Sequence, residues 1–280
     1  MYDLKTEYTN PELIWSTDFL FKTIDRKDLV IIDTRTAEAF ANGHIPNAKH
    51  FDLYFVNCDD TDPKPLASFT RMWANLLGWR GVRETDTIIF YGDFLDMCAA
   101  RGFWFLEYLG HNDVHVLNGG INAWIAENRP IETSSKKPQP TKFNFNVISS
   151  RIATYATILE KISNKNSVIL DNRSYSEFIG VDKRAKYGGA IPGASHLDWE
   201  NLYEHDSGHI KSALELQNTF NPLKISPKLD ITLYCNTGYR SAYAYLALRL
   251  LGYHNIRNYL GSWQEWGNRE GLPIWQPPKS

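Results

Sequence analysis

The sequence predicts an α/β fold of two domains, each a parallel sheet flanked by helices, related to each other by internal duplication. Three observations predict it. Phrases of sequence recur at a near-constant spacing, short apolar runs alternate with helix-forming runs, and a polar segment containing prolines lies midway along the chain. With 280 residues, the chain is long enough for two domains that each bury a sizeable core.

The repeat is clearest in the second part of each half. The LeuGly dipeptide that ends at Gly110 recurs at Gly252, and Trp124 recurs as Trp266. Both pairs are 142 residues apart, because 252 − 110 and 266 − 124 each give 142. A constant offset between such phrases indicates two copies of one structural unit.

The first part of each half repeats as well. VIIDTR at 30–35 matches VILDNR at 168–173, an offset of 138. GHIPNA at 43–48 matches GAIPGA at 189–194, an offset of 146. The second half therefore carries about eight extra residues (146 − 138) within Ile179–Tyr187.

Each half contains apolar runs that alternate with helix-forming runs. The β-branched runs are typical of buried parallel strands. The expected strands are Val30–Ile32, Thr87–Phe90, Val168–Leu170 and Ile231–Tyr234. Two runs that are apolar all round are expected to be helices packed against a sheet: Phe103–Leu109 and Ala242–Leu251.

The polar stretch SerSerLysLysProGlnPro, which begins at Ser134, reads as a linker. We therefore expect a first domain at 1–132, a linker at 133–146 and a second domain at 147–280.

Composition excludes several classes of function. The net charge is −2, from 30 basic and 32 acidic residues, which argues against nucleic acid or a membrane surface as partner. No apolar run approaches the roughly 18 residues of a membrane span, and the N-terminal sequence does not resemble a signal peptide. Three cysteines outside any CxxC pair predict a reducing, cytoplasmic location. The histidines form no HExxH pattern, so we expect no metal and no cofactor.

The segment Tyr234–Ser241, YCNTGYRS, carries the strongest chemical signal. Cys235 directly follows an expected strand, and an expected helix follows the segment. Loop N–H groups at a helix N-terminus attract anions and lower the pKa of a cysteine, which favours the nucleophilic thiolate. Cys235 is therefore the expected nucleophile, acting on an anionic substrate.

The other residues of this segment are expected to bind the substrate. Gly238 lets the loop curl so that N–H groups converge, and Arg240 supplies a positive charge. Arg240 has an alternative role, pairing with a carboxylate such as Asp171. Ser241 caps the helix, donates to the sulfur, or does both. The residues expected chiefly to lend backbone N–H groups are Asn236, Thr237 and Tyr239.

Four further residues complete the expected site. Asp171 and Arg173 follow a buried strand and are expected to form an ion pair that supports the loops. Arg184 lies in the extra segment of the second half and is a candidate second cation for the substrate. Trp199 is a candidate wall residue.

Taken in order, these phrases resemble the tandem-domain rhodanese family of sulfurtransferases. The resemblance rests on AspThrArg and GlyHisIlePro in the first half, AspAsnArg and IleProGlyAla in the second, the loop CNTGYRS and the closing GSWQEW. It implies two rhodanese-like domains, with an inactive first domain and a catalytic cysteine in the second, which matches Cys235. It also implies transfer of the sulfane sulfur of thiosulfate to cyanide, a cellular thiol or another thiophilic acceptor through a Cys235 persulfide.

The first half fits an inactive domain. With the offset of 142, position 235 falls on Asp93, and a carboxylate cannot form a persulfide. Cys98 then falls opposite Arg240, outside the position of the nucleophile, and is expected to be a buried thiol.

Three alternatives to a thiosulfate sulfurtransferase remain. The 3-mercaptopyruvate sulfurtransferases of the same fold typically have a loop that resembles CysGlySerGlyVal. They also have an arginine at the position after the phenylalanine, where this chain has Ile179 after Phe178. Cysteine phosphatases resemble Cys-x5-Arg, whereas four residues separate Cys235 from Arg240. A sulfur carrier without enzymatic turnover is the third alternative, and the intact loop argues against it.

Overall fold

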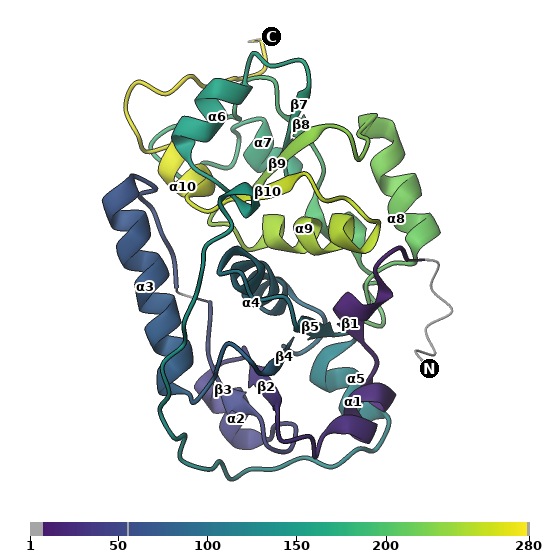
Figure 1. Cartoon of the computed structure of the whole chain (residues 1–280). Coiled ribbons are helices and arrows are strands. Elements are labelled where there is room, and N and C mark those ends of the chain that lie inside the picture. The colour runs from purple at the N-terminus through teal and green to yellow at the C-terminus, as the bar shows by residue number, and fades with distance from the viewer. Residues whose placement is uncertain (1–7, 55, 279–280) are drawn as a thin grey trace.

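The computed structural model describes residues 8–54 and 56–278. Each half of the chain forms one parallel five-stranded sheet flanked by helices (Figure 1). The strand order is β1-β5-β4-β2-β3 in the first sheet and β6-β10-β9-β7-β8 in the second. Because the two orders are equivalent, the structure confirms the α/β class and the internal duplication.

The elements are as follows. The strands of the first sheet are β1 (Ile14–Trp15), β2 (Leu29–Asp33), β3 (Lys49–His50), β4 (Thr87–Tyr91) and β5 (Val114–Leu117). The strands of the second sheet are β6 (Ile152–Ala153), β7 (Ser167–Asp171), β8 (Ser195–His196), β9 (Asp230–Tyr234) and β10 (Ile256–Tyr259). The α-helices are α1 (Thr17–Thr23), α2 (Ala37–Asn42), α3 (Pro63–Trp79), α4 (Met97–Tyr108), α5 (Gly120–Ala126), α6 (Tyr155–Lys161), α7 (Tyr175–Phe178), α8 (Ala213–Phe220), α9 (Arg240–Leu250) and α10 (Ser262–Trp266). The 3-10 helices are η1 (Pro11–Leu13), η2 (Ser149–Arg151), η3 (Trp199–Leu202) and η4 (Asn221–Leu223).

The four expected strands lie within β2, β4, β7 and β9, which confirms them. The two expected helices correspond to α4 and α9, and both begin earlier than expected. Helix α4 begins at Met97 because the Asp96 side chain accepts hydrogen bonds from its first turn and so caps it. Helix α9 begins at Arg240, directly after the loop that contains Cys235.

Side chains of each central strand alternate between two cores, as the pleat of a strand requires. In β4, Ile88 and Phe90 point toward the other domain, and Ile89 and Tyr91 point toward the outer face. The inward-facing residues of both sheets belong to one cluster that runs through the whole molecule. The two domains therefore share a hydrophobic core.

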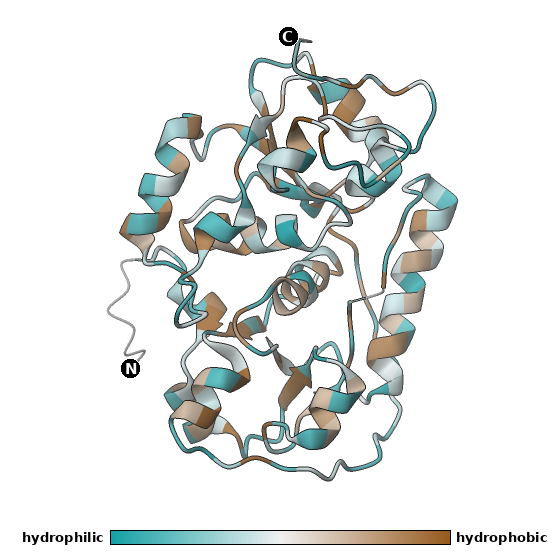
Figure 2. Cartoon of the chain, turned by 180° about the vertical axis from the view of Figure 1, so that it is seen from behind, coloured by the Kyte–Doolittle hydropathy of each residue, from teal (hydrophilic) through white to brown (hydrophobic). Residues whose placement is uncertain are grey.

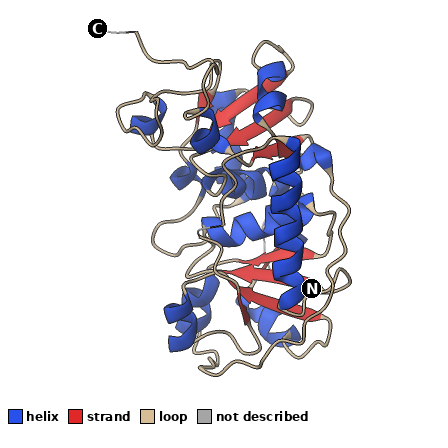
Figure 3. Cartoon of the chain, turned by 90° about the vertical axis from the view of Figure 1, so that its left-hand side faces the viewer, coloured by secondary structure: helices blue, strands red, loops and turns tan. Residues whose placement is uncertain are grey.

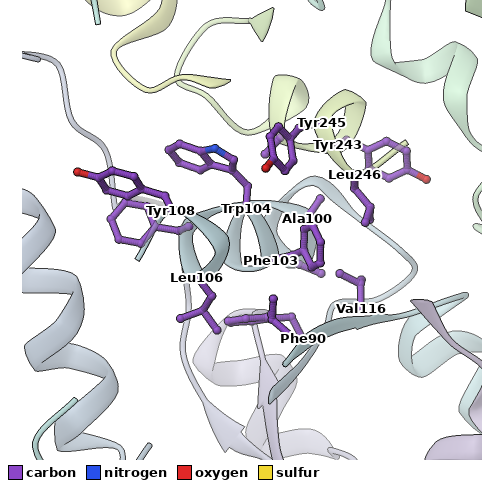
Figure 4. Packing of buried hydrophobic residues seen from close by; sticks show 14 of the residues in the cluster. Phe90, Ala100, Phe103, Trp104, Leu106, Tyr108, Val116, Tyr243, Tyr245 and Leu246 are labelled. Carbon is purple, nitrogen blue, oxygen red and sulfur yellow. The ribbon is translucent and has the colours of Figure 1, made fainter. Parts of the chain in front are cut away.

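Helices α4 and α9 form the centre of this shared core and pack against each other (Figure 4). Phe103 and Trp104 of α4 and Leu246 of α9 are fully buried. Figure 3 shows the strands of the two sheets on either side of these central helices. Because α4 and α9 follow equivalent strands, the contact between domains brings together the two equivalent helices.

The outer face of each sheet has a smaller core of its own. In the first domain it is built around Trp15, Tyr91 and Trp124, and in the second around Trp263 and Trp266. Helix α3, the longest of the described helices, has one buried face that includes Phe69, Trp73 and Leu77, and its ribbon in Figure 2 carries both brown and teal segments.

The chain between the domains runs from 133 to 148 without strand or helix. It follows the first domain before it enters the second (Figure 1). Thr141, for example, donates through its N–H to the Gly78 carbonyl at 2.7 Å and through its hydroxyl to the Val82 carbonyl at 2.6 Å. The limits 1–132, 133–146 and 147–280 are retained as our proposal for the domains.

Leu246→Ala should lower the free energy of unfolding by about 2–5 kcal/mol, because a fully buried leucine side chain leaves a cavity in the shared core. Urea unfolding followed by tryptophan fluorescence and by far-ultraviolet circular dichroism should show one transition for both domains. The matched control is Leu214→Ala on α8, where the leucine is 59% exposed and the change should stay within about 0.5 kcal/mol. Two separate transitions, or equal losses from the two substitutions, would contradict a shared core.

Candidate active site

The loop Cys235–Tyr239 connects the central strand β9 to helix α9 and lies where the two domains meet. Two backbone hydrogen bonds from α10 hold its first residues. The Trp263 N–H donates to the Cys235 carbonyl at 3.0 Å, and the Gln264 N–H donates to the Asn236 carbonyl at 2.9 Å. The loop is therefore anchored by its own domain before it reaches the sulfur.

Cys235 is 1% exposed, and two hydrogen-bond donors lie beside its sulfur. The Gly238 N–H donates to Cys235 Sγ at 3.1 Å, and the Ser241 hydroxyl lies 3.5 Å from the same atom. Gly238 has a φ of +82°, and a Cβ at this position would lie 3.0 Å from Arg101 and 3.1 Å from the Leu260 carbonyl oxygen. The turn therefore requires glycine, as the sequence predicts.

A side chain on β10 holds the far side of the loop. The Asn258 amide donates to the Gly238 carbonyl at 2.9 Å, and its oxygen accepts from the Ser241 hydroxyl at 2.7 Å. Since the hydroxyl has one proton, Asn258 and the sulfur compete for it. Ser241 is the second residue of α9, with Tyr239 at the cap position. The expectation that Ser241 caps the helix is wrong, whereas its place beside the sulfur agrees with the expected donor role.

Burial acts to raise the pKa of Cys235, but the charge of Arg240 and hydrogen bonds from Ser241 and the loop backbone outweigh it and lower the pKa below its ordinary value. The two other thiols behave in the opposite way. Burial raises the pKa of Cys58 to about 11 and also raises that of Cys98. Of the three cysteines, Cys235 therefore forms a thiolate most readily.

The guanidinium of Arg240 forms a two-point ion pair with Glu177 of α7. Nη1 donates to Oε2 at 2.6 Å and Nη2 donates to Oε1 at 2.9 Å. Burial acts to raise the pKa of Glu177, but the bonds to Arg240 and Ser174 lower it to about 2. The alternative role for Arg240, pairing with a carboxylate, is therefore found. The expected partner, Asp171, is wrong because α7 brings Glu177 closer.

Asp171 pairs with Arg173 instead. Arg173 Nη2 donates to Asp171 Oδ2 at 2.6 Å and to the Gly189 carbonyl at 2.7 Å, and both side chains are fully buried. The pair joins the end of β7 to the segment after the eight-residue insertion. This geometry agrees with the expected supporting role.

Arg184 lies near the same ion pair. Its Nε is 3.8 Å from Glu177, its Nη2 is 3.0 Å from Asp182, and its side chain is 56% exposed. Arg240 and Arg184 are thus balanced by two carboxylates, and the four side chains carry no net charge.

A cavity of about 450 Å³ opens above Cys235, and both domains line it. Trp199 is part of its wall, as the sequence predicts. From the first domain come Tyr54, Asn57 and Met97. From the second come Glu177, Arg184, Trp199, Glu200, Cys235, Asn236, Thr237, Tyr239 and Arg240. A second cavity, of about 480 Å³ beneath the linker, is lined by no cysteine.

The first domain has an equivalent loop, and its counterpart of Cys235 is Gly92. Strands β4 and β9 begin 143 residues apart (230 − 87), so 235 − 143 gives 92. The expectation that Asp93 occupies this position is wrong. Helix α4 has 12 residues and α9 has 11, so the offset changes from 143 to 142 within the helix. By the same offset, Cys98 is the counterpart of Ser241, so the expectation that it lies opposite Arg240 is wrong.

A carboxylate fills this equivalent loop. A Cβ on Gly92 would lie 1.7 Å from Asp96 Oδ2, so Asp96 occupies the place of a cysteine side chain. Asp96 Oδ1 accepts from the N–H groups of Cys98 and Ala99 at 2.9 Å each. Burial raises the pKa of Asp96 to about 6 against the effect of these bonds. The loop of the first domain thus binds an anion from its own chain.

Sequence reasoning missed Glu177, Asn258 and Arg101, which act on the loop or on Arg240, and the cavity-lining residues Tyr54, Asn57, Met97 and Glu200. Ser174 and Glu177 form a capping box, a pattern that the sequence shows as Ser-x-x-Glu. Asn258 stood out as a polar residue in a short strand, where asparagine is rare. Arg101 was the one basic residue in the apolar run from Met97 to Leu106.

Comparison with known proteins identifies the family. A model described as the rhodanese-like domain matches twice, over residues 16–127 and 154–269, so the chain belongs to the rhodanese family. The sulfur carrier protein TtuD of Thermus thermophilus is 32% identical over 282 residues, covering 95% of this chain and 98% of that protein. The thiosulfate sulfurtransferase of Corynebacterium glutamicum is 33% identical over 285 residues, covering 96% and 92%.

A solved structure is similar over most of the chain. The crystal structure of SseA from Escherichia coli, a 3-mercaptopyruvate sulfotransferase of the rhodanese fold, has a TM-score of 0.78 at 25% identity. The match covers 90% of this chain and 98% of the SseA chain.

Within residues 8–54 and 56–278, no helix combines the length and apolar character needed to cross a membrane. The same residues contain no cluster of three or more histidine, cysteine, aspartate or glutamate side chains suited to a metal ion.

Cys235 should react with iodoacetamide before Cys58 and Cys98, because only its pKa lies below the ordinary value. Its alkylation rate should rise with pH through a midpoint that lies below that of an ordinary cysteine. Limited alkylation at neutral pH, followed by peptide mass spectrometry, measures this order. Earlier labelling of Cys58 or Cys98 in the folded protein would contradict the electrostatic account.

Proposed function

We propose that this rhodanese-family protein is a sulfurtransferase that moves the sulfane sulfur of thiosulfate to a thiophilic acceptor through a persulfide on Cys235. Cyanide and cellular thiols are the acceptors of suitable chemistry. The observation that carries the proposal is the sulfur of Cys235, placed at a two-domain cavity with a backbone N–H aimed at it. A lowered pKa favours the thiolate, which is the nucleophilic form.

The first half of the reaction loads the enzyme. The Cys235 thiolate attacks the outer sulfur of thiosulfate, a new S–S bond forms, and the S–S bond of thiosulfate breaks. The electron pair of the broken bond leaves with sulfite. The terminal sulfur of the persulfide is an anion, and we propose that donors of this loop stabilise it, since the Gly238 N–H and the Ser241 hydroxyl already lie beside Cys235 Sγ.

The second half returns the enzyme to its starting state. The carbon of cyanide attacks the terminal sulfur, a C–S bond forms, and the S–S bond to Cys235 breaks. The electron pair returns to Cys235 as the thiolate, and thiocyanate leaves. Neither half requires a change of protonation at the sulfur, which is consistent with a site that has no histidine among its lining residues.

Arg240 and Arg184 act within a charge-balanced group. Thiosulfate carries two negative charges. Because Glu177 neutralises Arg240, thiosulfate in this cavity meets N–H donors and a paired arginine instead of an unpaired cation. Arg184 is 56% exposed and lines the cavity, and we propose that it contacts the outer oxygens of the substrate. We propose that Asn236, Thr237 and Tyr239 shape the entrance, since all three line the cavity.

A sulfur carrier is the second candidate, favoured by the name and near-complete coverage of the Thermus thermophilus relative. A carrier would form the same persulfide but pass the sulfur to a partner protein, with slow turnover on small acceptors. We also propose a cytoplasmic location, because the three cysteines are unpaired.

Thiosulfate with cyanide should give a higher kcat/KM than 3-mercaptopyruvate with cyanide, because the loop CNTGYRS and Ile179 depart from the mercaptopyruvate pattern. Cys235→Ser should abolish turnover with both donors, and Cys58→Ser, which alters a thiol outside the cavity, should retain most of it. Steady-state kinetics measure all of these. The reverse donor ranking would assign the chain to the mercaptopyruvate class. Persulfide loading with negligible cyanide turnover would favour the carrier.

Glu177→Gln should lower the KM for thiosulfate, because it removes the carboxylate that neutralises Arg240 while a glutamine oxygen can keep the helix cap. We expect a change of about tenfold, equivalent to about 1.4 kcal/mol. The matched control is Glu200→Gln, which removes a second carboxylate from the cavity wall without unpairing Arg240. An unchanged KM in Glu177→Gln, or an equal fall in the control, would show that Arg240 does not contact the substrate.

A further inference from the structure

Arg101 is a fully buried arginine of the first domain that reaches the catalytic loop of the second. It lies on α4, in the helix that packs against α9. Its hydrogen-bond acceptors among the described residues are two backbone carbonyls and no carboxylate, and its Nε is buried without a partner. A buried charge with so little compensation is costly, so its retention points to a specific task.

The contacts of Arg101 bridge the two domains at the loop. Nη1 donates to the Thr237 carbonyl at 2.6 Å, and Nη2 donates to the Val56 carbonyl at 2.8 Å. The guanidinium also lies over the ring of Tyr239, with its carbon 4.0 Å from the ring centroid. The Tyr239 hydroxyl in turn donates to the carbonyl of Leu53 in the first domain.

The bond from Arg101 to Thr237 determines the direction of one peptide group. No described peptide bond is cis, and in a trans peptide the C=O and the following N–H point in opposite directions. The Thr237 C=O points to Arg101, and the N–H of the same peptide group, that of Gly238, points to Cys235 Sγ at 3.1 Å. A charged donor on the carbonyl also polarises the peptide group and strengthens the hydrogen bond from its N–H.

Asn258 fixes the next peptide group in the same manner, by donating to the Gly238 carbonyl at 2.9 Å. Two successive carbonyls of the loop are therefore held by side chains outside the loop, one from each domain. Asn258 belongs to the catalytic domain, whereas the first domain supplies the residue that acts on the peptide group touching the sulfur.

We propose that Arg101 is a positioning residue for sulfur transfer: by binding the Thr237 carbonyl, it aims the Gly238 N–H at the sulfur of Cys235. This inference rests on the proposed function. It gives the first domain, whose own loop is filled by Asp96, a direct role in the chemistry of the second.

A solely structural role is the competing explanation, since Arg101 also ties the domains together. Arg249 provides the matched control. It lies on α9, is largely buried, and crosses the same interface to form an ion pair with Glu107 at 2.9 Å. It belongs neither to the cavity wall nor to the loop. Arg249→Met therefore weakens the interface and leaves the orientation of the loop unchanged.

The test uses three full-length variants: Arg101→Met, Arg101→Lys and Arg249→Met. In each, two quantities are measured: the pH dependence of Cys235 alkylation by neutral iodoacetamide, and the rate of persulfide formation from thiosulfate. Arg101→Met should raise the apparent pKa of Cys235 by about one unit and slow persulfide formation about tenfold. Arg101→Lys keeps a charge but replaces the planar fork, so it should recover part of both quantities. Arg249→Met should lower the melting temperature and leave both unchanged.

A wild-type pH profile and loading rate in folded Arg101→Met would overturn the proposal, as would an equal shift in Arg249→Met. Should Arg101→Met fail to fold, Arg101→Lys decides. An apparent Cys235 pKa above that of wild type, with a rate of persulfide formation between the wild-type rate and a tenfold loss, supports the positioning role. A wild-type pKa together with a wild-type rate contradicts it. Failure of the proposed function is distinguishable, because the wild-type protein itself would then form no persulfide, whereas the alkylation profiles would still report the effect of Arg101 on the thiolate.

Discussion

The hydrogen bond from the Gly238 N–H to the sulfur of Cys235 is the interaction on which the site depends. A thiolate that is 1% exposed has lost most of its hydration, and a buried charge is stable only where fixed donors replace water. Every unusual feature of the loop serves this bond. Gly238 takes a φ of +82° that other residues avoid, and Arg101 and Asn258 hold the carbonyls on either side.

The duplicated fold shows the same loop in two conditions. In the second domain it surrounds a cysteine at a cavity of about 450 Å³, and in the first it surrounds the carboxylate of Asp96, with glycine in place of the cysteine. Both loops follow a central strand and precede a helix of the shared core, so both present N–H groups to an anion. One loop is built to receive a sulfur anion, while the other is satisfied by its own chain. The first domain thus fills its own loop with Asp96 and, from α4, contributes Arg101 to the loop of the second.

The α/β class, the duplication, the four longest strands and the place of Cys235 could be predicted from the sequence. Each of these features leaves a local signal: apolar runs, a fixed offset between repeats, or the order strand, loop, helix. Two-residue edge strands such as β1 and β8 are too short to show a period. The Asp93 assignment failed because one extra residue in α4 leaves no visible change of pattern in a helix that is buried on all sides. Glu177 reaches Arg240 from 63 residues away, and Arg101 reaches the loop at Thr237 from 136 residues away, so only the packing of α7 and α4 brings them to the site.

The central claim is that Cys235 itself accepts the sulfur, and its most direct test is incubation of the protein with thiosulfate in the absence of any acceptor. Peptide mass spectrometry should find one added sulfur, about 32 Da, on Cys235. The sulfite released should equal the modified protein, one molecule per chain. An unmodified Cys235, the sulfur on Cys58 or Cys98, or sulfite that forms only after an acceptor is added would contradict the persulfide mechanism.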